Sequence, residues 1–393
     1  MKLVFISNYI SHHQKPFCDA MRQKIGKNFI FMETMPMEKE RLDMGWEPIR
    51  ENYVFRTNES EKKAKKIAVD AEIVILGSAS DNYIIPRLKT KKLTFKYAER
   101  FYKTGLTLRN LPHAAAGAWL HHGRFQRYPL YMLCASAYTP ADAAIFHNYV
   151  GRTYKWGYFP EVKRYDVAEL MEKKQSAASV GEEHSRISIL WAGRLIGWKH
   201  PEAAVQLAAS LKEKGYSFRM SMIGNGEMEI QLHDMIREKG LEDCVEMLGA
   251  MPPEEVRRHM EKADIYLFTS DFNEGWGAVL NESMNSGCAV VASHAIGSVP
   301  FLIKNGENGL IYENGNQLDL EKQVLRLLED GAFRKKIAEN AYETMINLWN
   351  AETAAERFLI LTEKLLKNEN TDSLFLDGPC SKAAILKNDW YQH

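Results

Sequence analysis

Two kinds of hydrophobic pattern alternate along the chain. Short apolar runs such as Leu3–Ile6 and Glu72–Leu76 are bounded by polar residues or glycine, which predicts buried strands. Stretches with helical spacing of apolar residues separate them, for example the lysine-rich segment Glu61–Val69. This alternation of strand and helix patterns is typical of a parallel sheet covered by helices.

The pattern predicts the elements of two halves. In the first half we expect strands at 3–6, 28–32, 72–76, 93–97 and 131–135, and helices at 15–24, 61–69 and 141–147. In the second half we expect strands at 187–192, 218–223, 244–248, 264–269 and 288–292, and helices at 201–214, 228–239, 253–262, 277–286, 317–328, 333–348 and 353–366. Ligands of such sheets bind at the carboxyl ends of the strands, so the loops after Ala192, Ile223, Leu248, Thr269 and Ala292 are expected to form one site.

The length of 393 residues exceeds what one hydrophobic core usually supports, so two domains are expected. Residues 172–185 have almost no large apolar side chains, which predicts a linker or an exposed hairpin. We therefore expect an α/β domain over 1–170, a linker over 171–186, a second α/β domain over 187–350, and a helix with a tail over 351–393.

Composition narrows the class further. Hydrophobic residues make up 45% of the chain and charged residues 26%, which excludes a disordered or fibrous protein. No apolar stretch reaches the length of a membrane helix, and the start of the chain lacks the pattern of a signal peptide. The five cysteines are widely spaced and odd in number, which argues against disulfides or a zinc site and favours a cytoplasmic protein.

Charge is divided unevenly between the halves. Residues 1–185 hold 29 Lys and Arg against 20 Asp and Glu, a net charge of +9, and residues 186–393 hold 22 against 31, a net charge of −9. A basic first half favours an anionic partner, with solvated helix faces as the alternative. The zero overall charge and the lack of a basic-aromatic module give no support to nucleic-acid binding.

The segment Ser270–Glu282 carries the clearest chemical signal. Glu274 is expected in a loop after a buried strand, and Glu282 on the helix that follows. Gly275 and Gly277 keep the turn open, and the N–H groups of residues 276–279 at a helix N-terminus can bind a phosphate. The two carboxylates can bind hydroxyl groups of the sugars that flank a diphosphate.

Two cations follow the first strand of the second half. Arg194 and Lys199 lie on the strand-to-helix loop after Ala192, at the same predicted sheet edge as Glu274. A guanidinium and an ammonium group both bind phosphate oxygens well, so this loop is a candidate clamp for a nucleoside diphosphate. The alternative is a surface ion pair.

The glycines of Gly224–Gly226 fit either a nucleotide-contacting backbone or a plain tight turn.

The second half of the sequence resembles a known family. Residues 187–348 are similar to the C-terminal domain of the family 4 glycosyltransferases, which have the two-domain GT-B fold. Four motifs match in order and spacing: Gly193–Lys199, Ile223–Glu227, Leu248–Pro252 and the glutamate segment Glu274–Glu282. The match in the first half rests on position more than on motif.

The resemblance implies two Rossmann-like domains facing across a cleft, with the last helix and tail packing back on the first domain. It also implies retaining transfer of a sugar from a nucleotide donor without a metal or another cofactor, and it places Glu274, Arg194 and Lys199 at the reaction. The donor-binding residues that it implies are Gly193, Arg194, Lys199, Gly224, Asn225, Gly249, Met251, Glu274, Gly275, Trp276, Gly277, Ala278 and Glu282.

The first half departs from the family at two places. The loop after the first strand, Ser7–Gln14, has no glycine, so His12, His13 and Gln14 are candidates for contact with the donor or the acceptor. Glu99 stands near the place where many members carry a catalytic-side histidine. The alternative for Glu99 is a pairing role with Arg100 or a nearby lysine.

These observations together predict a glycosyltransferase that uses a nucleotide-sugar, with a UDP-sugar favoured over a GDP-sugar. The expected acceptor is a hydroxyl of a saccharide or a lipid-linked saccharide in polysaccharide synthesis, with peripheral contact to an anionic membrane surface as a further hypothesis. The alternatives are an epimerase or phosphorylase of the same fold, or a non-catalytic partner that binds a nucleotide-sugar.

Overall fold

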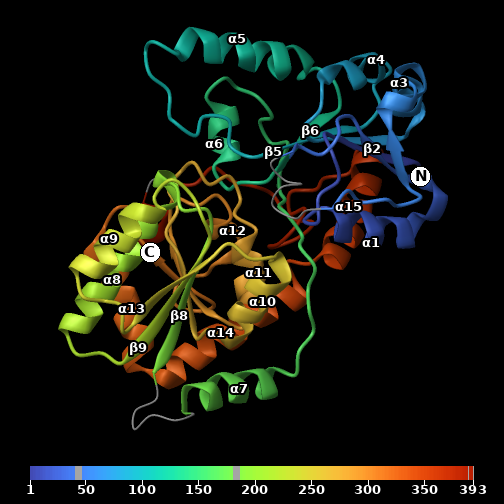
Figure 1. The fold of residues 1–393 in the computed structure, drawn as a ribbon. Helices are drawn as coiled ribbons and strands as arrows, with labels where there is room; N and C mark the ends of the chain where they lie inside the picture. The colour runs from blue at the N-terminus through green and yellow to red at the C-terminus, as the bar shows by residue number, and fades with distance from the viewer. Residues whose placement is uncertain (40–46, 180–185, 388, 393) are drawn as a thin grey trace. The chain divides into compact units, whose positions relative to one another are not determined.

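The computed structural model describes residues 1–39, 47–179, 186–387 and 389–392. The chain divides into two compact units (Figure 1). Unit 1 comprises Met1–Glu161 with Trp349–Asn388, and unit 2 comprises Val162–Leu348 with the residues that follow from Asp389. The chain thus leaves unit 1 at Glu161 and returns to it at Trp349.

Unit 1 contains a seven-stranded parallel sheet in the order β3-β2-β1-β4-β5-β6-β7. Its strands are β1 Leu3–Ser7, β2 Phe29–Glu33, β3 Val54–Arg56, β4 Ile73–Leu76, β5 Thr94–Ala98, β6 Leu130–Cys134 and β7 Thr153–Lys155. Its α-helices are α1 Lys15–Ile25, α3 Glu61–Asp70, α4 Ile85–Leu88, α5 Leu111–His121, α6 Thr139–Ala144 and α15 Ala351–Leu366.

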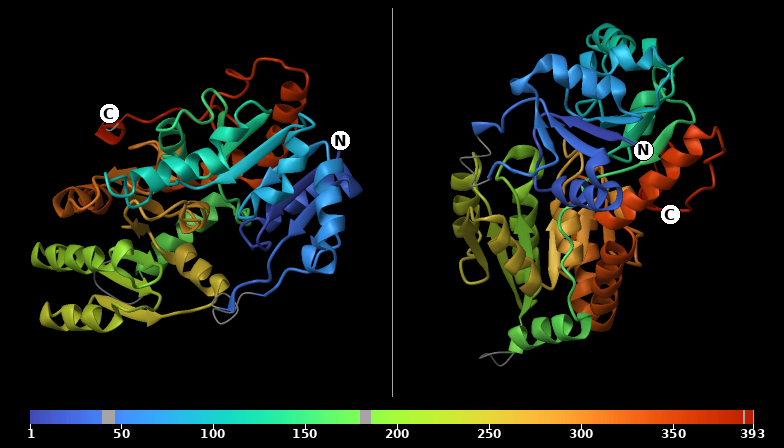
Figure 2. Two further views of the ribbon diagram at one scale, coloured as in Figure 1. Left: turned by 90° about the horizontal axis from the view of Figure 1, so that it is seen from above. Right: turned by 90° about the vertical axis from the view of Figure 1, so that its right-hand side faces the viewer.

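The last long helix completes unit 1. Asn350 caps α15 by accepting a hydrogen bond from the Thr353 N–H, and Phe358 on this helix is fully buried. The Phe358 ring lies 5.0 Å from that of Phe95 and 5.7 Å from that of Trp156. Figure 2 shows α15 beside α1, so the sheet of unit 1 is covered in part by residues distant in sequence.

Unit 2 contains a six-stranded parallel sheet in the order β10-β9-β8-β11-β12-β13. Its strands are β8 Ile187–Ala192, β9 Phe218–Ile223, β10 Val245–Gly249, β11 Ile265–Phe268, β12 Ala289–Ser293 and β13 Leu310–Tyr312. Its α-helices are α7 Val167–Ser179, α8 Pro201–Glu213, α9 Glu229–Glu238, α10 Pro253–Lys262, α11 Val279–Asn285, α12 Val299–Leu302, α13 Gln317–Glu329 and α14 Gly331–Asn347. Figure 1 shows α8 and α9 on one face of the sheet and α10 and α11 on the other.

The predicted linker is wrong over its first part. Residues 171–179 belong to α7, which begins at Val167. Leu170 and Met171 join the hydrophobic core of unit 2, and the Lys174 ammonium group is buried and donates to the carbonyl groups of Met260 and Ala263. The apolar residues that anchor this helix come just before the polar stretch, so the composition of 172–185 alone concealed it. The rest of the predicted linker, 180–185, lies outside the described residues.

Both units are doubly wound α/β domains, as predicted. Among the described residues, no helix combines the length and the apolar composition needed to cross a bilayer. The five cysteines are all buried and free, which agrees with the expectation that they form no disulfide framework.

Candidate active site

The loops at the carboxyl edge of the unit 2 sheet meet as predicted. All six strands are parallel, so the loops after β8, β9, β10, β11 and β12 leave the sheet at one edge. Backbone hydrogen bonds connect neighbouring loops: the Gly224 N–H donates to the Gly249 carbonyl at 2.9 Å, and the Leu195 N–H donates to the Asn225 carbonyl at 2.7 Å. The sequence motifs of this half are therefore adjacent in space.

Lys199 and Glu274 form an ion pair at the centre of this edge. The Lys199 Nζ lies 2.5 Å from the Glu274 Oε2, and their side chains are only 13% and 12% exposed. The Ser270 hydroxyl donates a second hydrogen bond to the same carboxylate oxygen, at 3.0 Å. Because water is largely excluded, this pair is held far more firmly than a surface ion pair.

A buried tryptophan and a threonine fix the backbone beneath this pair. Trp191 on β8 donates from its indole nitrogen to the Thr269 Oγ1 at 2.8 Å, and that hydroxyl donates to the Lys199 carbonyl at 2.7 Å. The Asp271 N–H donates to the Trp198 carbonyl at 3.0 Å. These contacts tie the loop after β8 to the loop after β11. The roles of Trp191 and Thr269 are not evident from the sequence, because each matches the pattern of an ordinary strand residue.

Arg194 is exposed on the same loop as Lys199. Its guanidinium carbon lies 5.9 Å from the centre of the Trp198 ring, and the Lys199 Nζ lies 4.7 Å from that centre. The indole thus lies near both cations, where its π-face favours positive charge. Arg194 and Lys199 thus place two cations on the loop after β8, and Glu274 pairs with the second of them.

Gly224 and Gly226 allow the loop after β9 to approach the loop after β8. Both have positive φ angles, 142° and 155°. A Cβ atom on Gly224 would overlap the carbonyl oxygen of Gly193, and one on Gly226 would overlap the Leu195 backbone. The glycines therefore serve close backbone packing.

The helix after the glutamate loop begins later than predicted. α11 runs over Val279–Asn285 and has seven residues, and Gly277 has a φ of 80°, outside the helical region. The Trp276 side chain is fully buried and donates from its indole nitrogen to the Asn281 Oδ1 at 2.9 Å. Trp276 and Gly277 therefore precede the helix, and the predicted helix start at Gly277 is two residues too early. The tight turn at Gly277 and the buried indole delay the start of the helix.

Glu282 lies in the first turn of α11 and is partly buried. Burial raises the pKa of its carboxyl group to about 7; the Arg257 guanidinium lowers this pKa, and Glu254 raises it. A partly protonated carboxyl group can donate as well as accept a hydrogen bond, which suits contact with a hydroxyl group.

The Glu282→Gln variant is expected to show a pH-dependent gain in stability. The usual pKa of a glutamate is near 4.5 and that of folded Glu282 is near 7, so the folded wild type binds more protons between these values and loses stability as pH rises. The variant lacks this titration. Its free energy of unfolding relative to wild type should rise by about 1–3 kcal/mol from pH 5 to pH 8. Denaturant unfolding at both pH values measures this, with Glu246→Gln, on exposed surface, as the control. A difference that does not change with pH would contradict it.

In unit 1, the loop after β1 places the predicted histidines together. The rings of His12 and His13 lie 3.8 Å apart, and His13 stacks on Tyr158 at 5.9 Å. The Gln14 side chain accepts a hydrogen bond from the Ser11 N–H at 3.4 Å, just before α1. These three residues thus lie at the carboxyl end of β1, where a ligand of this sheet is expected.

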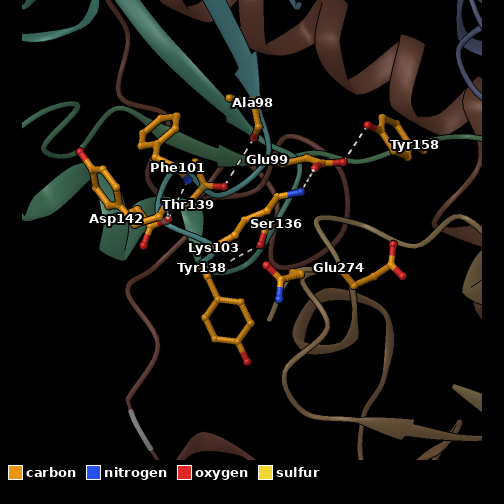
Figure 3. A network of polar contacts seen from close by, with 12 residues as sticks. Ala98, Glu99, Phe101, Lys103, Ser136, Tyr138, Thr139, Asp142, Tyr158 and Glu274 are labelled. Atoms are coloured by element: carbon orange, nitrogen blue, oxygen red, sulfur yellow. Dashed lines mark hydrogen bonds and ion pairs between the residues drawn. The ribbon is translucent and has the colours of Figure 1, made fainter. Parts of the chain in front are cut away.

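Glu99 lies at the carboxyl end of β5 in a network of polar contacts (Figure 3). Its carboxylate accepts a hydrogen bond from Tyr158 at 2.8 Å and pairs with Lys103 at 2.8 Å. The pairing with a nearby lysine, which was the alternative for Glu99, is thus present.

Asp142 on α6 accepts hydrogen bonds from the N–H groups of Phe101 at 2.7 Å and Tyr102 at 3.1 Å, which holds the loop that carries Glu99.

Removing the Asp142 carboxylate is expected to loosen this loop. In Asp142→Ala, the N–H groups of Phe101 and Tyr102 lose their acceptor, and the free energy of unfolding should fall by about 1–3 kcal/mol. Chemical denaturation measures this, with Glu363→Ala as the control because Glu363 pairs with Lys367 on the surface. Equal stability of the two variants would show that Asp142 does not hold the loop.

Unit 1 also contains a cavity that its sequence does not reveal. It has a volume of about 350 Å³ and lies at the carboxyl ends of β4 and β5, with Asp81, Lys96, His121, His122 and Arg124 in its wall. Asp81 binds the Lys96 ammonium group at 2.5 Å and the His121 Nδ1 at 2.9 Å. Burial lowers the pKa of His122 to about 3, so this imidazole is neutral. The cavity offers polar groups of both charges. Its residues are spread over the sequence from Leu76 to Arg124, and no motif connects them.

Comparison with known proteins identifies the second half of the chain. Residues 172–344 match the family described as glycosyl transferases group 1. The amylovoran biosynthesis glycosyltransferase AmsK of Erwinia amylovora is 34% identical over 154 residues, which is 38% of each chain. The putative colanic acid biosynthesis glycosyltransferase WcaL of Salmonella typhimurium is 30% identical over 201 residues, 46% of this chain and 48% of its own length. These matches span about two fifths to one half of the relatives' length.

A solved structure extends the likeness to both units. The Anabaena protein Alr3699/HepE, crystallised in complex with UDP, superposes with a TM-score of 0.66 over 93% of this chain and 100% of its own, at 17% identity. At this identity the likeness concerns the fold, which is the GT-B fold of two Rossmann-like domains. The match of residues 172–344 to the group 1 glycosyl transferases agrees with the resemblance seen in the sequence.

Proposed function

We propose that this protein is a retaining, metal-independent glycosyltransferase. It transfers a sugar from a nucleotide donor, with a UDP-sugar favoured, to a hydroxyl of a saccharide or lipid-linked saccharide in polysaccharide synthesis. The observation that carries the proposal is the buried contact between Lys199 and Glu274 at the carboxyl edge of the group 1 domain. It joins a cation suited to a diphosphate with a carboxylate suited to sugar hydroxyls.

In this proposal the cations of the loop after β8 replace a metal ion. As the bond between the sugar and the diphosphate breaks, negative charge grows on the leaving phosphate, and Arg194 and Lys199 stabilise it. Glu274 holds the donor sugar and keeps the Lys199 ammonium group in place between turnovers. Glu282 binds the ribose, and backbone groups near Gly249 and Met251 hold the base.

The proposed acceptor site lies in unit 1. Polar groups of both charges line the cavity beside β4 and β5, which suits the hydroxyl groups of a saccharide. His12, His13, Gln14 and Glu99 are the proposed acceptor-side groups outside this cavity. The preference for UDP is supported by the UDP complex of the Anabaena protein, and the acceptor class by the two relatives named for polysaccharide synthesis.

Product analysis tests the proposal. The protein is incubated with UDP-, GDP- and ADP-sugars, with and without a mixture of oligosaccharides, and free nucleotide and sugar products are measured by NMR. We expect release of UDP that depends on the acceptor, and a product with the anomeric configuration of the donor. An isomerised donor without release of nucleotide indicates the epimerase, and a requirement for phosphate indicates the phosphorylase. Donor binding without any product indicates a non-catalytic partner, and each of these outcomes overturns the proposal.

A further inference from the structure

Helix α5 exposes an unusual amount of apolar surface. Ala118 is its only buried residue, while Trp119 is 61% exposed and Leu120 is 43% exposed. Leu108, in the turn before the helix, is 92% exposed. Figures 1 and 2 show α5 at the outer edge of unit 1. Exposed apolar residues on most proteins are scattered singly, so a helix that carries several of them indicates a surface for interaction.

The apolar residues of α5 form a continuous face. Pro112, Ala116 and Leu120 follow one another at intervals of four residues, and Trp119 follows Ala116 by three, so these four lie on one side of the helix. All four are exposed. The sequence of α5, LPHAAAGAWLH, contains no Lys, Arg, Asp or Glu, although most of the helix faces solvent. An ordinary surface helix carries charged residues on its solvent side.

The charged residues closest to α5 in the sequence are all basic, and Asp81, from another segment, binds His121 at the end of the helix. From residue 100 to residue 141 the sequence has five Lys and Arg and no Asp or Glu. Arg100 pairs with Asp142, and Lys103 pairs with Glu99. The other three, Arg109, Arg124 and Arg127, are exposed and form no ion pair with any residue that the structure describes. An exposed apolar helix is therefore flanked by cations whose charge is not neutralised by neighbouring carboxylates.

We propose that α5 and its flanking arginines bind the surface of an anionic phospholipid membrane. Leu108, Trp119 and Leu120 enter the boundary between headgroups and acyl chains, and the arginines attract the lipid phosphates. The helix has eleven residues, so its length of about 16 Å is half of what a membrane-spanning helix needs, and α5 lies along the surface. The lack of acidic residues from 100 to 141 complements an anionic lipid surface.

The position of α5 connects membrane binding with the proposed reaction. His121, the last residue of α5, and Arg124, just after it, belong to the wall of the unit 1 cavity. A saccharide on a lipid carrier would therefore meet the proposed acceptor cavity directly beside the membrane-bound helix. Only this link to the acceptor rests on the proposed function, and the membrane contact itself does not.

Vesicle flotation with the full chain tests the proposal. Vesicles of equal parts phosphatidylglycerol and phosphatidylcholine are compared with phosphatidylcholine alone, and we expect the wild type to float only with the former. Trp119→Ser/Leu120→Ser should lower binding more than tenfold. Arg109→Gln/Arg127→Gln should lower it by about 25-fold, since each cation near such a surface contributes about fivefold. Added salt should weaken binding of the wild type more than that of the arginine variant.

Matched variants serve as controls. Leu376→Ser removes a fully exposed leucine of unit 1, and Arg219→Gln/Lys239→Gln removes two exposed cations of unit 2; both should bind vesicles as the wild type does. Circular dichroism and UDP titration of each variant show whether the fold and the donor site are intact, so failure of the proposed function is seen separately. A wild type that does not bind anionic vesicles, an α5 variant that binds them unchanged, or a dimer that the α5 substitutions dissociate overturns the proposal.

Discussion

Replacing Lys199 with methionine is expected to lower the rate of sugar transfer by about a hundredfold to a thousandfold. The Lys199 ammonium group is nearly buried, so its positive charge acts in surroundings that screen it weakly. Removing one such group that stabilises a leaving anion usually has an effect of this size. The rate is measured with saturating donor, so that weaker donor binding does not account for the loss.

The control for this prediction is Lys212→Met. Lys212 also forms an ion pair, with Asp243 at 2.6 Å, but both side chains are well exposed. Its removal should leave the rate unchanged within a factor of two. Glu274→Gln keeps the shape of the side chain and removes its charge, so it should also lower the rate strongly. A Lys199→Met variant that keeps more than a third of the wild-type rate would contradict a catalytic role for this lysine.

Gly224→Ala is expected to have the second large effect. The added methyl group would overlap the Gly193 carbonyl oxygen, and the φ of 142° is a conformation that residues with side chains rarely adopt. The loops after β8 and β9 must move apart, which should lower the free energy of unfolding by about 3 kcal/mol. It should also weaken nucleotide binding, because Arg194 follows Gly193 directly.

Gly215→Ala separates the effect of the steric overlap from the effect of the positive φ angle. Gly215 also has a positive φ, 78°, but no atom lies within 4 Å of the place where its Cβ would be. Its substitution should therefore destabilise by only about 1–2 kcal/mol, the penalty of the left-handed conformation itself. Denaturant unfolding of both variants measures the difference. If they lose the same stability, the close approach of the two loops is not what requires a glycine at position 224.

The regular elements of unit 2 could be predicted from its sequence because local signals agree there. For example, Pro201 begins α8, Asn316 caps α13 and Asp330 caps α14, and each buried strand is bounded by a glycine or a polar turn. The loop motifs then follow from the parallel topology, which brings all strand ends to one edge. This is why Lys199 and Glu274, 75 residues apart, could be expected to lie together.

Other elements carried too little local signal. β3, β7 and β13 have three residues each, which is too short for a pattern to appear. α5 was missed because its alanines and glycine show no contrast between a polar and an apolar face. α7 could not be predicted because its anchoring residues, Leu170 and Met171, precede the polar stretch whose composition predicts a linker.

The candidate site could likewise be predicted only in part. The charged residues on the two loops of unit 2 were found from the motif, but the supports beneath them were not, because Trp191 and Thr269 act through contacts that only the folded sheet creates. The same holds for the unit 1 cavity, where Asp81 joins Lys96 and His121 over long distances in sequence.

The most direct test of the central claim, a diphosphate site at the carboxyl edge of unit 2, is a calorimetric titration of wild type and Arg194→Ala with UDP and with uridine. Charge-assisted hydrogen bonds contribute about 1.5–3 kcal/mol each, so wild type should bind UDP more than a hundredfold more tightly than uridine. Arg194→Ala should weaken the binding of UDP by about tenfold or more and leave that of uridine unchanged. Equal affinity of the wild type for UDP and uridine, or no effect of the substitution on UDP, would contradict the account.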